Sequence, residues 1–224
     1  MTETKTLETR IRLDGPRWLT KLRRDAMDRF AALGFPTTHN EEWKYTNVSP
    51  IAKADFKPGG PARAELSSVP QADAECDTRL VFVNGGFSRE LSSLDKLPRG
   101  VKAGSLAELL RTGDAILESH LARYGEFNQH AFVALNTALA EDGAVVEFAR
   151  DAILEQPIHL VFLSMPDARP TVSHPRNLIL AGRGSQAAVI ETYAGPAGAV
   201  YFTNAVTEIV VAEGAVMDHY KLQH

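Results

Sequence analysis

Side chains that could bind a metal meet near the end of the sequence. His219 follows Asp218 in the last β-rich run, and His224 is close behind. Imidazole and carboxylate groups are common metal ligands, but neighbouring residues of a strand point to opposite faces of a sheet. Asp218 and His219 should therefore point apart. Since the sequence also has no His-Glu-x-x-His motif, it predicts a hydrogen-bonded histidine in a sheet wall and no metal site.

Two of three similarly placed carboxylates could form a catalytic pair. Glu147, Glu191 and Asp218 occupy roughly equivalent places in successive β-rich runs, so they could stack if these runs lie on top of one another. Carbohydrate-active enzymes need paired carboxylates on opposite sides of the scissile bond, which keeps such an enzyme open as an alternative. Ladders of this kind are more often solvated faces. We therefore assign no catalytic residue.

The one cysteine, Cys76, is a poor candidate nucleophile. It stands between Glu75 and Asp77, and neighbouring acids raise the pKa of a thiol, which leaves less of the reactive thiolate. A single thiol also forms no internal disulfide and no four-thiolate cluster site within the chain.

Signatures of nucleotide binding and serine nucleophiles are missing. A P-loop needs a Gly-Lys pair, and the sequence contains none. Gly182-x-Gly184 is half of a dinucleotide fingerprint, but no third glycine follows, so it is better interpreted as a strand corner. No Gly-x-Ser-x-Gly elbow is present either. The residues thus predict no catalytic site and no assigned cofactor-binding residue.

Composition excludes several classes of protein. The chain has 224 residues, 44% of them hydrophobic and 23% charged, with a formal net charge of -4. This balance is typical of a globular protein, and it argues against a general affinity for nucleic acid. No apolar run approaches the roughly 20 residues of a membrane span, and the N-terminus is too polar for a secretory signal. We predict a cytoplasmic protein.

Residues 1–56 are predicted to form an N-terminal helical domain. Asp14 and Pro16 should cap and start its main helix, and Gly34 with Pro36 should end it. Trp43 should pack on this helix as an aromatic anchor. The apolar stripe of the helix recurs at steps of three and four and consists of Trp18, Leu22, Ala26, Phe30 and Leu33.

Residues 57–75 are rich in Pro, Gly, Ala and Ser, which predicts a flexible linker. A mixed α/β segment over residues 76–140 should follow. In it, Leu80–Val83 reads as a strand that turns at Asn84-Gly85, and Ser105 could cap a short helix. Another helix is expected over about residues 128–139.

Residues 141–224 change in character. Short apolar strands alternate with small-residue turns, and glycine or alanine sits at each corner. This weak repetition favours the start of a β-solenoid, incomplete within the chain. An antiparallel sandwich also alternates strands and turns and remains an alternative. The predicted fold class is therefore mixed α and β, with an N-terminal helical domain followed by the first solenoid coils.

Several stretches resemble the SufB/SufD family of the SUF iron–sulfur cluster assembly system. The most specific is Glu-Trp-Lys-Tyr-Thr at residues 42–46, which favours the SufD branch. The others are residues 34–37, residues 80–85, residues 201–204 and residues 219–223. The resemblance covers the chain from about Pro16 to its end.

This resemblance implies a right-handed parallel β-helix after the helical domain. It also implies a non-catalytic scaffold subunit that works with SufB and the ATPase SufC. No cofactor is expected in this chain, since the full complex would handle the cluster. Because the sequence stops within the expected solenoid, its last coil should offer an open end for self-association. A β-solenoid carbohydrate-active enzyme and a generic interaction module are the alternatives.

Overall fold

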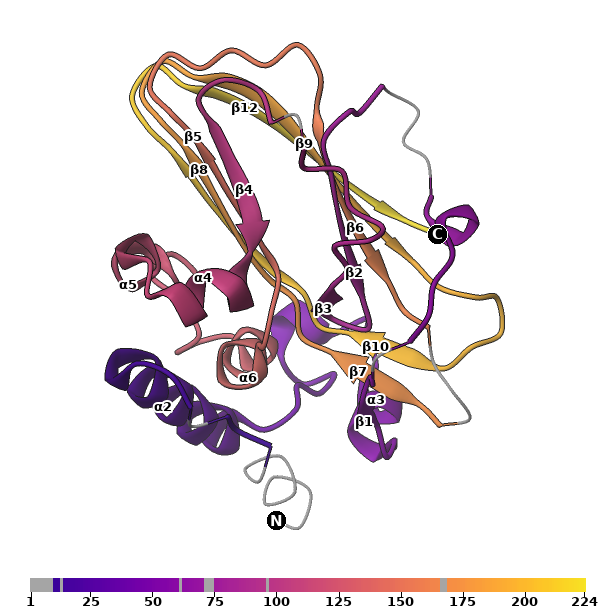
Figure 1. Cartoon of the computed structure of the whole chain (residues 1–224). Helices are drawn as coiled ribbons and strands as arrows, with labels where there is room; N and C mark the ends of the chain where they lie inside the picture. Colours follow the sequence, from indigo (N-terminus) through magenta and orange to yellow (C-terminus); the bar gives the residue numbers. More distant parts are fainter. Residues whose placement is uncertain (1–9, 13, 61, 71–74, 96, 166–168) are drawn as a thin grey trace.

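The structure is a computed structural model that describes residues 10–12, 14–60, 62–70, 75–95, 97–165 and 169–224. Helices dominate the first part of the chain and parallel strands the second. Figure 1 shows helices α2, α4, α5 and α6 gathered beside one end of the long strands. The fold is mixed α/β with sheets that are mainly parallel, which confirms the coarser part of the predicted fold class.

Helix α2 (Arg17–Leu33) starts directly after Pro16, whose extended backbone occupies the N-cap position without a side-chain cap. The predicted cap by Asp14 is therefore wrong. Gly34 ends the helix at φ 67°, donating its N–H to the carbonyl of Phe30. The buried face is rotated by about one residue from the expected stripe and consists of Leu19, Arg23, Ala26, Met27 and Phe30.

The Trp43 region forms a short 3-10 turn, η1 (Glu41–Trp43), followed by helix α3 (Ser49–Lys53). The indole of Trp43 packs on Phe132, with ring centroids 5.2 Å apart. Phe35 joins Phe132 to Phe30 of α2 through two further ring contacts. Ring contacts thus lead from Trp43 through Phe132 and Phe35 to Phe30 of α2.

The segment predicted as a linker contains strand β1 (Lys57–Pro58) and the 3-10 turn η2 (Leu66–Ser68). β1 pairs with β7, and Val69 is buried against Val81 and Val161 in an apolar cluster. The described residues of this segment therefore pack on the β-structure. Residues 61 and 71–74, which belong to the same predicted linker, lie outside the described residues.

The mixed segment holds strands β2 (Arg79–Val83), β3 (Gly86–Phe87) and β4 (Val101–Ser105) and helices α4 (Leu106–Thr112), α5 (Ala115–His120) and α6 (Ala131–Leu139). Asn84 and Gly85 both have positive φ, as a tight hairpin turn requires, and β2 pairs with β3. Ser105 caps α4 by accepting the N–H of Glu108. These local predictions are confirmed.

The remaining strands pair in parallel with one another in three sheets, ordered β1-β7-β10, β11-β8-β5-β4 and β12-β9-β6-β2-β3, and β5 also pairs antiparallel with β4. Residues 30 apart in the chain lie side by side, such as Tyr201 and Thr171 in one sheet and Val216 and Gln186 in another. The antiparallel sandwich is therefore wrong. The strands of residues 141–224 are β5 (Ala144–Phe148), β6 (Ile158–Leu163), β7 (Thr171–Ser173), β8 (Arg176–Ala181), β9 (Gln186–Ala194), β10 (Tyr201–Thr203), β11 (Val206–Val211) and β12 (Val216–Gln223).

The two larger sheets share one core. Alternate residues of each strand, such as Val146, Leu160 and Ile179, meet between the sheets. The intervening residues of β5 and β8, such as Val145 and Leu178, point outward and are covered by helical residues. Residues on the inner faces are thus sealed between two sheets. The outer faces meet helices, the segment that contains Val69, or solvent.

Candidate functional site

A polar cluster interrupts this apolar core near β12. The side chain of Glu191 in β9 is fully buried, and its carboxylate accepts three hydrogen bonds from three strands. The Tyr193 hydroxyl donates at 2.7 Å, the Thr207 hydroxyl at 2.6 Å and the Nε2 atom of His219 at 2.9 Å. We call these four residues the Glu191 cluster.

The electrostatics of the cluster favour an ionised carboxylate. Burial alone would raise the pKa of Glu191, but the hydrogen bonds from His219, Thr207 and Tyr193 and the charge of Lys221 together lower it. Burial and the adjacent carboxylate raise the pKa of Tyr193, which keeps its hydroxyl protonated as a donor. Since Glu191 accepts, His219 must carry a proton on Nε2.

The hydrogen bonds continue into the neighbouring strands. The side-chain amide of Asn177 in β8 donates to the Thr207 hydroxyl at 3.1 Å, and its oxygen accepts the N–H of Ala144 at 2.9 Å. The Lys221 ammonium lies 4.9 Å from the centre of the Tyr193 ring, a cation–π contact. Together with Asn177, the Glu191 cluster therefore links strands β5, β8, β9, β11 and β12 through hydrogen bonds.

His219 and Asp218 point apart as predicted. His219 faces the interior and is hydrogen-bonded to Glu191, whereas Asp218 is exposed. His224 contributes a backbone N–H to the carbonyl of Tyr193. The prediction of a hydrogen-bonded wall histidine is confirmed. No group of three or more His, Cys, Asp or Glu side chains in the described part of the chain is placed to hold a metal ion.

The three carboxylates do not form the stack that a catalytic pair would need. Glu147 lies on the outer face of β5, where it pairs with Lys102 at 3.1 Å. Glu191 is on the inner face of another sheet, and its register partner in β12 is Lys221. Asp218 pairs with Ala188 and is exposed. The hypothesis of a carboxylate ladder is therefore wrong.

The other sequence candidates occupy structural positions. Cys76 is half-buried, and burial first, then the charge of Asp77, raises the pKa of its thiol. Gly182 and Gly184 form the corner between β8 and β9, as predicted. A Cβ at Gly182 would lie 2.6 Å from the carbonyl oxygen of Phe148, so this corner has no room for a side chain.

Sequence reasoning missed a second buried network, between Arg176 of β8 and Glu208 of β11. The Arg176 Nη2 atom lies 2.7 Å from Oε2 of Glu208. The carboxylate also accepts backbone N–H groups of Ala122, Tyr124 and Gly125 at 2.8–2.9 Å. This network fastens the loop between α5 and α6 to the β-structure. An arginine and a glutamate inside apolar strands were its only sequence signal.

The fold and the Glu191 cluster together define a class of protein. It is a mixed α/β protein built mainly on parallel sheets, and its apolar interior contains buried, hydrogen-bonded polar side chains. Within the described residues, no helix has the length and apolar character needed to cross a membrane. Comparison with known protein families identifies the family. Residues 5–160 match the SufBD protein N-terminal region, and residues 162–224 match the SufBD core domain of SUF system iron–sulfur cluster assembly. The chain belongs to the SufBD family.

Individual relatives agree with this assignment. The chain is 33% identical over 218 residues to an iron–sulfur cluster assembly SufBD family protein of Synechocystis, an alignment that covers 92% of this chain and 47% of the relative. It is 28% identical over 195 residues to the iron–sulfur cluster assembly protein SufD of Escherichia coli, covering 84% of this chain and 42% of the relative. The chain thus spans less than half the length of these relatives.

A plant relative is more distant. The chloroplastic protein ABCI7 of Arabidopsis thaliana is 24% identical over 212 residues, covering 92% of this chain and 44% of the relative.

Proposed function

We propose that the chain serves as a scaffold subunit in iron–sulfur cluster assembly, in a complex with SufB and the ATPase SufC. The observation that carries this proposal is the family match along almost the whole chain, over residues 5–160 and 162–224. The relative from Escherichia coli is a SufD protein, and the Glu-Trp-Lys-Tyr-Thr segment favours the same branch. The iron–sulfur cluster is cargo of this machinery.

The scaffold is proposed to be a right-handed parallel β-helix whose first coils are the strands β5 to β12. The 30-residue register between β7 and β10, β8 and β11, and β9 and β12 supports this proposal, because a solenoid stacks equivalent residues of successive coils. Gly184 and Gly214 stack at the same corner, both with positive φ.

A non-catalytic role is part of the proposal. Glu147, Glu191 and Asp218 face different surroundings, and the sequence has no Gly-Lys pair for a P-loop. We expect the purified chain neither to hydrolyse ATP nor to retain a stable cluster after anaerobic reconstitution and gel filtration. A cytoplasmic location is consistent with these expectations and belongs to the same proposal.

The test is a gene deletion in the host organism with SufB and SufC left intact. We expect reduced activity of iron–sulfur enzymes, restored by the wild-type gene. An affinity tag on the restored protein should co-purify SufB and SufC, as measured by mass spectrometry of the eluate. Normal iron–sulfur enzyme activity in the deletion strain, together with no SufB in the eluate, would contradict the proposal.

A further inference from the structure

A half-open cavity of about 200 Å³ lies outside the Glu191 cluster. It is bounded by the residues of α3 and the segment after it, by β7 and β10, and by α6. Its apolar lining includes Phe35, Phe56 and Phe202, which we call the aromatic wall. Phe56 and Phe202 have ring centroids 5.8 Å apart. A benzene molecule fills an apolar cavity of about 150 Å³, so this space suits one aromatic ring with a small substituent.

His174 supplies one polar group of the cavity. Its Nδ1 atom lies 3.2 Å from the amide nitrogen of Asn204, which also donates to the carbonyl of Phe132 at 3.0 Å. Because the amide nitrogen donates, Nδ1 accepts and the neutral ring carries its proton on Nε2. Among the described residues, that Nε2–H has no hydrogen-bond partner. Burial, and then the charge of Arg10, lower the pKa of His174 to about 3, so the ring is a neutral donor at pH 7.

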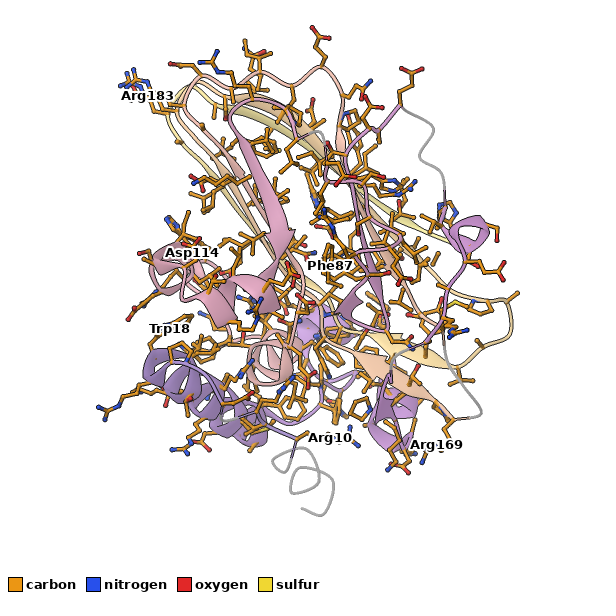
Figure 2. All side chains as sticks on the ribbon, viewed as in Figure 1. Arg10, Trp18, Phe87, Asp114, Arg169 and Arg183 are labelled. Carbon is orange, nitrogen blue, oxygen red and sulfur yellow. The ribbon has the colours of Figure 1, made fainter. Side chains whose placement is uncertain are left out.

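Positive charge dominates the rim of the cavity. Arg10 and Lys53 both line it. The Arg10 Nη2 atom donates to the carbonyl of Phe56 at 2.8 Å, which holds the guanidinium beside the aromatic wall. Asp55 is the one carboxylate of the lining, and Lys57 pairs with it at 2.6 Å. Figure 2 shows Arg10 on the side of the molecule where β7 and β10 lie in Figure 1.

We propose that this cavity binds a small aromatic carboxylate. The ring lies against the aromatic wall, and the carboxylate accepts hydrogen bonds from Arg10 and from the Nε2–H of His174. Three features select this chemical class: an apolar space of one-ring size, a neutral donor whose proton no described residue accepts, and a guanidinium held at the rim. Charge-assisted hydrogen bonds from guanidinium to carboxylate are among the stronger polar contacts in proteins.

The experiment uses the 224-residue chain and 4-fluorophenylacetate as the probe, followed by ¹⁹F NMR at pH 7. We expect saturable binding, displaced by unlabelled phenylacetate. The neutral analogue phenylacetamide should displace it at least about tenfold less effectively, since it lacks the charge that Arg10 recognises. Binding confined to the carboxylate would support the proposal.

Substitutions at the cavity test whether the probe binds there. Arg10→Gln should weaken binding at least about tenfold, whereas Arg12→Gln, two residues away and outside the cavity lining, should leave it unchanged. His174→Leu should weaken binding as well. If His174→Leu fails to fold, the Arg10 and Arg12 pair still decides. No saturable binding up to about 10 mM, equal displacement by phenylacetamide, or unchanged affinity in Arg10→Gln would each overturn the proposal.

Discussion

Arg176 and Glu208 form an ion pair whose two side chains are each only 2% exposed, with Nη2 and Oε2 separated by 2.7 Å. The aligned hydrogen bond of the pair comes from Nε at 3.2 Å, and Nη1 donates to Thr137 and Asn136. Burial raises the pKa of Glu208, but Arg176 and the backbone donors outweigh it and lower the pKa. Arg176 therefore joins β8 to β11 through an ion pair and to α6 through hydrogen bonds with neutral side chains.

Removing one partner of this pair should be costly. Glu208→Gln leaves the Arg176 charge buried and uncompensated, so we expect a loss of about 3–5 kcal/mol in the free energy of unfolding. Urea denaturation measures this loss. Arg150→Gln is the control, because its ion pair with Asp151 is exposed and should cost less than about 1 kcal/mol. Equal effects of the two variants would show that the buried pair does not hold the helices on the sheet.

The Glu191 cluster should stabilise the fold above acidic pH. The pKa of Glu191 is lowered in the folded chain, so its contribution is present above the unfolded pKa and is lost as pH falls through the folded value. Glu191→Gln should lower stability at pH 7 by about 1–3 kcal/mol, and by less in acid. Asp218→Asn, on the exposed face of β12, is the matched control. A pH-independent difference would speak against an ionised Glu191.

His159 should make stability fall between neutral and mildly acidic pH. Burial, and then the charge of Arg79, lower its pKa from 6.5 to about 4. Below about pH 6.5 the unfolded chain binds a proton that folded His159 does not take up until about pH 4. The free energy of unfolding should therefore fall by up to about 1.4 kcal/mol for each pH unit between these values.

Urea denaturation from pH 4.5 to 7.5 (about the range in which histidine titrates) tests this expectation. His159→Gln keeps a hydrogen-bonding group for the Thr192 hydroxyl, which lies 2.8 Å from Nε2 of His159. Since glutamine cannot titrate, the slope of stability with pH should become shallower. His39→Gln, at an exposed position, serves as the control. An unchanged slope in His159→Gln would contradict the role of His159.

Trp43 should anchor the N-terminal region through Phe132. Trp43→Ala removes the ring contact at 5.2 Å and part of the burial of a large side chain, so we expect a loss of about 1–3 kcal/mol. Tyr45→Ala is a close control, because Tyr45 is 92% exposed and should cost less than about 0.5 kcal/mol. Thermal unfolding measures both variants. Equal unfolding midpoints of the two variants would show that Trp43 does not stabilise the packing of this region.

β12 should mediate self-association of the 224-residue chain. It is an edge strand that pairs with β9 alone among the described strands, and Val216 and Tyr220 are each 55% exposed on it. Free N–H and C=O groups on such an edge offer a template for another chain. We expect light scattering coupled to gel filtration to show a mass above that of a monomer at high micromolar concentration.

Tyr220→Lys should shift this equilibrium towards the monomer, because lysine on an edge opposes strand pairing. Arg183→Lys, at a corner between strands, keeps its charge and should leave the mass unchanged. A clean monomer of the wild-type chain at the same concentration would show that the β12 edge does not pair.

Local features could be predicted from the sequence because short-range rules govern them. The turn at Asn84-Gly85 and the end of α2 at Gly34 depend on positive φ, which few residues tolerate. The Ser105 cap depends on a side-chain oxygen that accepts a backbone N–H at the start of a helix. The opposite orientation of Asp218 and His219 followed from the two-residue period of a strand. The family resemblance rested on contiguous motifs of the same local kind.

Tertiary structure alone decided which face of each strand is inside. Glu147 and Glu191 look alike in the sequence, yet one meets solvent and Lys102, and the other is sealed within a shared core. Strand periodicity specifies that side chains alternate between two faces, but not which of the two faces is buried. That depends on which sheet and which helices cover the strand. The same reason hid the pairing of Arg176 with Glu208, 32 residues apart: only the stacking of β8 on β11 brings them together.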